Sequence, residues 1–169
     1  MTFSEKIALA KEVIVHRTKT SFVSGRVLAD FIDTRYYFDE AKGNFYATVV
    51  FGIRAEGPPQ HTHGGAIAAL FDEILGATAW MNRLHSMTAQ LHINYLKSIP
   101  LGQQVFIEAN IQKVEGKKVT ICARIFDKYE TEFARAESLF IKQGKEKFQE
   151  MGEIPDELFT YGIDFESQD

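Results

Sequence analysis

The stretch HTHGGAIAALFDEILGATAW, residues 61–80, decides how this chain folds. From residue 64 onward it is apolar on nearly every side of a helix, which is typical of a helix buried in a protein core. Gly64 and Gly65 open this helix, and two acids, Asp72 and Glu73, lie in its middle. An ionised carboxylate among apolar side chains is costly unless it is paired. We therefore expect at least one of these acids to have a function.

The faces of this helix follow from a turn of 100° per residue. One face is predicted to pack into the core: Ile67, Leu70, Phe71, Ile74, Thr78 and Met81. The opposite face carries small residues and one acid: Gly65, Ala68, Ala69, Asp72, Gly76 and Ala79. Small residues allow another backbone or a slender ligand to come close, so we expect Asp72 to look into a narrow gap and Glu73 to lie toward its rim. The alternative is that this face is only tightly packed, with Asp72 as a satisfied buried polar group.

The start of the helix provides hydrogen-bond donors. The backbone N–H groups of Gly64 and Gly65 have no partner within the helix and lie at the positive end of its dipole, which suits an anion or a developing oxyanion. Gly65 and Asp72 are seven residues apart, roughly 10 Å along the helix axis, so one small group cannot touch both in one chain. Either they serve different functions, or Gly65 of one subunit faces Asp72 of another. A two-fold pair of antiparallel helices would build two such sites, which predicts a homodimer.

Composition is that of a globular protein and excludes several classes. The 169 residues, 45% of them hydrophobic and 25% charged, suit one folded domain. A net charge of −4 argues against a nucleic-acid partner. With Cys122 as its one cysteine, the chain has neither an internal disulfide nor a cysteine-based metal site. No apolar run reaches the ~20 residues of a membrane span, and the first residues lack a signal-peptide core, so we expect no membrane partner and a cytosolic location.

The spacing of apolar residues predicts the order of elements. The expected elements are an amphipathic helix at 3–15, a hairpin of strands 35–39 and 45–53, the long helix at 64–83, strands at 87–97, 104–113, 119–126 and 133–142, and a helical turn near 155–159. Short turns should make the last four strands antiparallel neighbours. The fold class is then α+β, with an antiparallel sheet of about six strands wrapped around the long helix. The expected divisions are an N-terminal helix and lead-in at 1–33, a domain at 34–142 and a charged tail at 143–169.

Strand 87–97 alternates between apolar and polar residues. Because successive side chains of a strand point to opposite faces, Met87 and Leu91 should share one side, with Thr88 and Asn94 on the other. Thr88 is therefore predicted to face a site rather than the core.

These motifs together resemble a known family. His63-Gly64-Gly65-Ala66-Ile67-Ala68, followed by the acid at Asp72, is similar to the helix signature of hotdog-fold acyl-CoA thioesterases, in the PaaI-type branch of the 4-hydroxybenzoyl-CoA thioesterase superfamily. The segments TAQLHINYLK (88–97) and IPLG (99–102) resemble the second strand of that family and its turn. The segment EGPP (56–59) resembles the branch of thioesterase-superfamily-member proteins. The resemblance runs from about residue 34 to 142.

The resemblance implies hydrolysis of an acyl-CoA thioester to a free acid and CoA, with no cofactor. Asp72 would be the catalytic carboxylate, acting either as general base on water or as nucleophile. The Gly65 N–H, supplied by a second subunit, would polarise the thioester carbonyl. His63 would help to bind or polarise the thioester end, or hold the loop, and Thr88 would orient the water near the acid.

The resemblance also implies a set of residues that bind acyl-CoA. This set is Gly64, Ala68, Ala69, Glu73, Asn94 and Lys97. The small side chains of Ala68 and Ala69 would admit a slender acyl group. Lys97 stands where many relatives have arginine, and Ser98 where proline is common. A lysine could still meet a CoA phosphate with less geometric demand; the alternative is a solvated lysine at a strand end.

Three other functions compete with hydrolysis. A zinc site at His61 and His63 would need Asp72 as a further ligand, and the length of the helix puts Asp72 too far away, so we expect no metal. A hydratase or dehydratase would need a differently placed acid–histidine pair. A non-catalytic hotdog protein that binds acyl-CoA as a sensor or scaffold is the main alternative, although the first 33 residues show no helix-turn-helix output module. The expected protein partner is a second copy, in a homodimer at least, with a tetramer left open.

Overall fold

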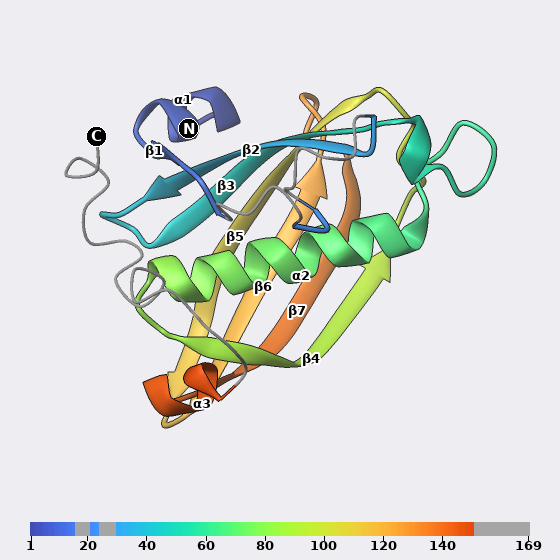
Figure 1. Ribbon diagram of the computed structural model, residues 1–169. Coiled ribbons are helices and arrows are strands. Elements are labelled where there is room, and N and C mark those ends of the chain that lie inside the picture. Colours follow the sequence, from blue (N-terminus) through green and yellow to red (C-terminus); the bar gives the residue numbers. More distant parts are fainter. Residues whose placement is uncertain (16–20, 24–29, 151–169) are drawn as a thin grey trace.

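One long helix lies against a seven-stranded antiparallel sheet in the computed structural model (Figure 1). The structure describes residues 1–15, 21–23 and 30–150. The helices are α1 (Phe3–Ala8), α2 (Gly64–Met81) and α3 (Lys145–Gln149), with one short 3-10 helix, η1 (Ile53–Ala55). The strands are β1 (Lys11–Val13), β2 (Ile32–Asp39), β3 (Asn44–Phe51), β4 (Ser86–Tyr95), β5 (Gln104–Glu115), β6 (Lys118–Phe126) and β7 (Glu132–Lys142). The expected α+β arrangement of a sheet around one buried helix is confirmed, and β1 brings the sheet to seven strands instead of about six.

The core face of α2 packs against the inner face of the sheet. All six residues expected on that face are buried, and Leu70, Phe71 and Ile74 are fully inaccessible to solvent. The sheet contributes equally buried side chains, among them Ile107 of β5 and Ile121 of β6. Because burying one side chain of this size stabilises a fold by about 1.5–3 kcal/mol, this contact holds the helix on the sheet.

The opposite face of α2 is open in the single chain. Gly65 and Asp72 are exposed, and Ala68, Ala69 and Gly76 are half-buried. Ala79, expected on this face, is instead fully buried, because the chain folds back over the end of α2, where the Leu84 N–H donates to the Ala79 carbonyl (2.9 Å). The narrow gap expected beside Asp72 is therefore not formed by one chain alone.

The strand order differs from the expected one. The sheet runs β1-β2-β3-β5-β6-β7-β4, so β4 pairs with β7, and β5 pairs with β3 and β6. The prediction that the last four strands are neighbours in chain order is wrong for β4 and β5. The reason lies in the connection 96–103, which is held by the loop before α2 instead of forming a hairpin: the Thr62 N–H donates to the Ile99 carbonyl (2.8 Å), and the Leu101 N–H to the Gln60 carbonyl (3.0 Å). β4 thus forms one edge of the sheet, beside α2 (Figure 1).

The N-terminal helix is also shorter than expected. The helix predicted for 3–15 ends at Ala8, and Lys11–Val13 continues as β1 on the edge of β2. Phe3 packs on the outer face of the sheet, where its ring stacks on Phe106 at 4.5 Å between centroids. Phe3 is buried on the outer face of the sheet and Val13 in the main core. Reaching both places requires an extended segment between them, so the chain leaves the helix although the apolar residues have helical spacing. The helical turn expected near 155–159 lies outside the described residues.

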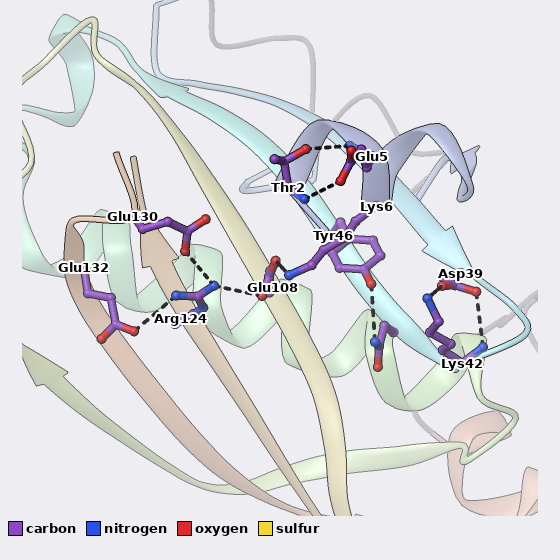
Figure 2. Close-up of polar contacts among 11 residues, drawn as sticks. Thr2, Glu5, Lys6, Asp39, Lys42, Tyr46, Glu108, Arg124, Glu130 and Glu132 are labelled. Atoms are coloured by element: carbon purple, nitrogen blue, oxygen red, sulfur yellow. Dashed lines mark hydrogen bonds and ion pairs between the residues drawn. The ribbon is translucent and has the colours of Figure 1, made fainter. Parts of the chain in front are cut away.

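Ion pairs cross the outer face of the sheet (Figure 2). Arg124 of β6 lies 3.2 Å from Glu108, 3.0 Å from Glu130 and 3.4 Å from Glu132, measured between guanidinium nitrogens and carboxylate oxygens. Lys6 of α1 also pairs with Glu108. The network therefore links α1 to the sheet, on the side that faces away from α2.

The end of α2 is fastened to the hairpin between β2 and β3. Gly43 in that turn has φ of +68°, a conformation that glycine adopts without strain. The Asn82 amide donates to the carbonyls of Gly43 (2.9 Å) and Thr78 (2.8 Å). A Cβ atom at residue 43 would clash with the Asn82 side chain, so glycine serves both the turn and this contact.

Truncation of the helix core should destabilise the fold. We expect Ile74→Ala to lower the free energy of unfolding by about 2–5 kcal/mol, because it opens a cavity beneath α2. Ile53→Ala is the matched control: Ile53 is 62% exposed, and its truncation should change stability by no more than about 0.5 kcal/mol. Urea denaturation followed by circular dichroism measures both. Similar losses in the two variants would contradict the packing described above.

Candidate functional site

An acid and a hydroxyl meet on the open flank of α2. The Thr88 Oγ1 of β4 donates a hydrogen bond to Asp72 Oδ1 at 2.9 Å, and both residues are exposed. β4 follows this flank along the helix: the Trp80 indole donates to the Ser86 carbonyl (3.1 Å) near one end, and the Tyr95 hydroxyl to the Gly64 carbonyl (2.9 Å) at the other. The pair predicted from sequence as acid and orienting hydroxyl therefore lies together, open to solvent.

A β-bulge turns Thr88 toward α2. The pairing of β4 with β7 shifts between Thr88 and Gln90, so that Thr88 lies opposite the buried Phe140. Directly opposed residues of an antiparallel pair share a face, which puts Thr88 on the inner face. The predicted strict alternation is wrong here: Thr88 and Leu91 lie on the same side, because the extra residue in the bulge shifts the alternation by one.

Two residues of the expected substrate-binding set lie away from this pair. Asn94 is opposed to Arg135, an exposed residue on the outer face. Lys97 follows β4 and is exposed, with its N–H donating to the Phe133 carbonyl (3.0 Å). Neither side chain is brought to Asp72.

The start of α2 is capped by His63. The imidazole Nδ1 accepts a hydrogen bond from the Gly65 N–H at 2.8 Å, which requires the neutral tautomer with its proton on Nε2. The N–H groups of Ala66 and Ile67 donate to the His63 carbonyl. Within the described part of the chain, the Gly64 N–H has no hydrogen-bond partner. Of the two donors expected from sequence, Gly65 is thus occupied by His63 and Gly64 is open.

The second acid points to the other flank of the helix. The Tyr36 hydroxyl of β2 donates to Glu73 Oε1, and the Ser21 hydroxyl donates to Glu73 Oε2 at 3.3 Å. Burial of Tyr36, together with the neighbouring Glu73 charge and its hydrogen bond, raises the pKa of the Tyr36 hydroxyl above its ordinary value. Glu73, expected at the rim of a substrate site, is therefore held against β2, apart from Asp72 and Thr88.

Sequence reasoning missed three residues that contact α2: Tyr36, Ser21 and Tyr95. Each donates its hydroxyl to α2 or to the side chain of Glu73. Their positions in the sequence lie far from the helix motif, and Tyr95 falls on the apolar side of its strand pattern. For the two tyrosines the one available signal is the phenol itself, since a tyrosine hydroxyl in a packed region usually finds a hydrogen-bond partner.

Neither a metal site nor a membrane helix is found in the described ranges. No three His, Cys, Asp or Glu side chains in residues 1–15, 21–23 and 30–150 gather in a way that could hold a metal ion. None of the helices described above is long and apolar enough to cross a bilayer.

Comparisons with known proteins show that this chain is similar to thioesterases. Residues 59–134 match the family model described as Thioesterase superfamily. Acyl-coenzyme A thioesterase THEM4 of Xenopus laevis is 36% identical over 107 residues, which cover 63% of this chain and 48% of that protein. The crystal structure of protein RHA08564, a thioesterase superfamily protein, is similar with a TM-score of 0.60 and 29% identity, over 64% of this chain and 53% of that chain.

A further solved structure agrees in fold. That structure is smu.793 from Streptococcus mutans UA159 bound to acetyl CoA, with a TM-score of 0.61 and 22% identity over 74% of this chain and 98% of that chain. The likeness to these structures confirms the expected hotdog fold. The chain spans about half the length of the curated relatives it matches.

Loss of the His63 cap should weaken α2. We expect His63→Ala to lower the free energy of unfolding by about 1 kcal/mol, because it leaves the Gly65 N–H without its acceptor. His63→Asn, which offers a side-chain oxygen at the cap position, should retain most of the stability. Thermal or urea unfolding compares the two. If asparagine is as destabilising as alanine, the imidazole stabilises the protein in some way other than as a cap.

Proposed function

We propose that this protein hydrolyses acyl-CoA thioesters to a free acid and CoA, because residues 59–134 match the Thioesterase superfamily model and the fold is similar to that of a solved thioesterase superfamily protein. The observation that carries the proposal is the hydrogen bond from Thr88 to Asp72 on the open flank of α2. A carboxylate beside a hydroxyl, in reach of solvent, is equipped to activate water. The curated relatives are named acyl-coenzyme A thioesterases, and acetyl CoA is the ligand of the smu.793 structure.

The proposed reaction uses Asp72 as general base. Thr88 donates to Oδ1 and leaves Oδ2 available to take a proton from water. The water oxygen attacks the thioester carbonyl carbon, and the tetrahedral oxyanion that forms then expels the CoA sulfur. The C–S bond breaks, the proton passes to the thiolate, and the acid and CoA leave. Direct attack by the Asp72 carboxylate, through an anhydride that water hydrolyses, is the alternative for the same residue.

The oxyanion requires donors that one chain does not bring to Asp72. Gly64 lies eight residues before Asp72 in α2, about 12 Å along the axis. We therefore propose a homodimer in which α2 of a second copy offers its N-terminus to Asp72. The open Gly64 N–H can bind the oxyanion directly, whereas the Gly65 N–H can do so only when His63 releases it. The half-buried Ala68, Ala69 and Gly76 would line the contact between the two helices.

The same arrangement predicts where the acyl group and the CoA part of the substrate bind. Between two facing helices, the small side chains of Ala68 and Ala69 leave room for a slender acyl group. Lys97 lies beyond the end of β4, whose last residue, Tyr95, contacts Gly64, so it suits a CoA phosphate at the mouth of the site. Asn94, on the outer face, could contact CoA only around the edge of β4. A cytosolic location is the expectation from the sequence, which leaves open whether such dimers pair into a tetramer.

A non-catalytic protein that binds acyl-CoA as a sensor or scaffold is the second candidate. The occupied Gly65 N–H favours it, since an oxyanion site with one of its two donors engaged is weaker. Incubation with a panel of acyl-CoA thioesters and a thiol-detecting dye separates the two. Thiol release supports hydrolysis, and tight binding without release supports the sensor.

Removal of the base should strongly lower turnover. We expect Asp72→Asn to lower kcat for the best acyl-CoA of the panel by at least about 100-fold, the usual range for a positioned base, with the unfolding midpoint nearly unchanged. Thr88→Ala should cost less, because it removes the orienting bond but leaves the carboxylate. Thiol release by stopped-flow or plate assay measures both. Unchanged turnover in Asp72→Asn would exclude this acid, and an equal cost for Thr88→Ala would make the hydroxyl more than an orienting group.

The donor at the helix start can be deleted with little change in structure. Proline suits the first helical position, and the extended conformation of His63, with φ of −65° and ψ of 135°, is compatible with a following proline. We expect Gly64→Pro, which lacks the N–H, to lower kcat by about 100-fold, and Gly64→Ala, which keeps it, to remain active.

Mixing inactive variants tests whether the site is shared. Co-refolded Asp72→Asn and Gly64→Pro chains should recover about a quarter of wild-type activity, since half of the random dimers would hold one intact site of two. No recovery in a sample shown to contain mixed dimers would mean that acid and donor act within one chain.

A further inference from the structure

Glu73, the acid next to Asp72, is engaged at both of its carboxylate oxygens. Oε1 accepts from the hydroxyl of Tyr36, a residue only 5% exposed, and Oε2 accepts from the hydroxyl of Ser21. The raised pKa of Tyr36 keeps its hydroxyl protonated, so it remains a donor to Glu73. Both carboxylate oxygens of Glu73 are therefore bonded within the chain.

The two neighbouring acids are attached to opposite parts of the sheet. Asp72 is bonded to Thr88 on β4, the last strand of the sheet order, and Glu73 to Tyr36 on β2, next to the other edge. Figure 1 shows α2 between these strands, with β2 on one side of it and β4 on the other. Consecutive side chains on a helix point about 100° apart. The two hydrogen bonds therefore restrain α2 from two directions, at two consecutive residues of the helix.

The core face of α2 is held by contacts of a different kind. Its contacts come from aliphatic and aromatic side chains such as Leu70 and Ile74, and apolar burial is non-directional. A carboxylate at the surface of the helix lies about 5–6 Å from its axis. A rotation of α2 by 10° would thus move Asp72 by about 1 Å, enough to lower a rate by up to about 100-fold.

We propose, on the basis of the function proposed above, that Glu73 is a positioning residue. Its bonds to Tyr36 and Ser21 set the rotation of α2 about its axis and thereby hold the Asp72 carboxylate at Thr88. Ser21 and strand β2 thus act on the reaction from the flank of α2 opposite Thr88.

Three variants and one matched control test this role. Tyr36→Phe removes the donor and keeps the ring, Glu73→Ala removes both acceptors, and Glu73→Gln keeps one acceptor for Tyr36. Tyr46→Phe is the control, because Tyr46 is as buried as Tyr36 but bonds to Asn44 on the outer face, away from α2. Each is assayed for kcat and KM with the acyl-CoA that the wild type cleaves best.

The expected result is a loss in kcat with little change in KM. Tyr36→Phe and Glu73→Ala should each lower kcat by about 10–100-fold, with KM within about threefold. Their combination should cost no more than either alone, because both break the same bond. Glu73→Gln should recover most of kcat, and Tyr46→Phe should match the wild type. Wild-type kcat in Tyr36→Phe and Glu73→Ala would overturn the proposal, as would a loss confined to KM, which would make Glu73 a substrate ligand.

A crystal structure of Tyr36→Phe provides a readout that does not depend on activity. The proposal requires the Thr88–Asp72 distance, 2.9 Å in the wild type, to exceed hydrogen-bond length in the variant. An unchanged distance would overturn the positioning role even if the protein is a thioesterase. If the wild type releases no thiol from any acyl-CoA, the proposed function fails, and this distance alone still decides whether Glu73 positions Asp72.

Discussion

The packing of one apolar helix face against the sheet is the constraint on which the rest of this structure depends. Leu70, Phe71 and Ile74 are completely removed from solvent, and burial on this scale is the main force that holds a fold together. With that face committed to the core, the remaining surface of α2 can carry groups that a core would not tolerate. Asp72 is exposed because the helix buries the opposite side so thoroughly.

The polar groups of α2 divide according to the strands that flank it. The edge strand β4 meets one flank and provides Thr88 to Asp72, whereas β2 meets the other and provides Tyr36 to Glu73. One acid is left open to solvent and its neighbour is tied into the fold. Two carboxylates adjacent in sequence thus have different environments, and this difference supports assigning the chemistry to Asp72 and the positioning to Glu73.

The two N–H groups at the start of α2 also lie in different environments. His63 takes up the Gly65 N–H and so stabilises the first turn of α2, whereas the Gly64 N–H has no hydrogen-bond partner among the described residues. The Tyr95 hydroxyl holds the Gly64 carbonyl from the end of β4. Strand β4 therefore contacts both the acid and the donor of its own α2, with Thr88 at Asp72 and Tyr95 at Gly64; in the proposed dimer these two groups belong to two different sites. A second copy of the chain, placed against this flank, would join the acid of one α2 to the donor of the other.

The sequence by itself determined that α2 exists and which of its faces packs on the sheet, and it predicted that Thr88 lies near Asp72. Helical spacing of apolar residues is a local property, readable within twenty residues, and the family resemblance added the link to Thr88. Only the tertiary structure decided that β4 lies beside β7, that a bulge turns Thr88 inward, and that Glu73 binds Tyr36 and Ser21. These outcomes depend on contacts between segments far apart in the chain. A polar side chain forms a hydrogen bond with whichever partner the packing brings near it, and no local sequence pattern specifies that partner.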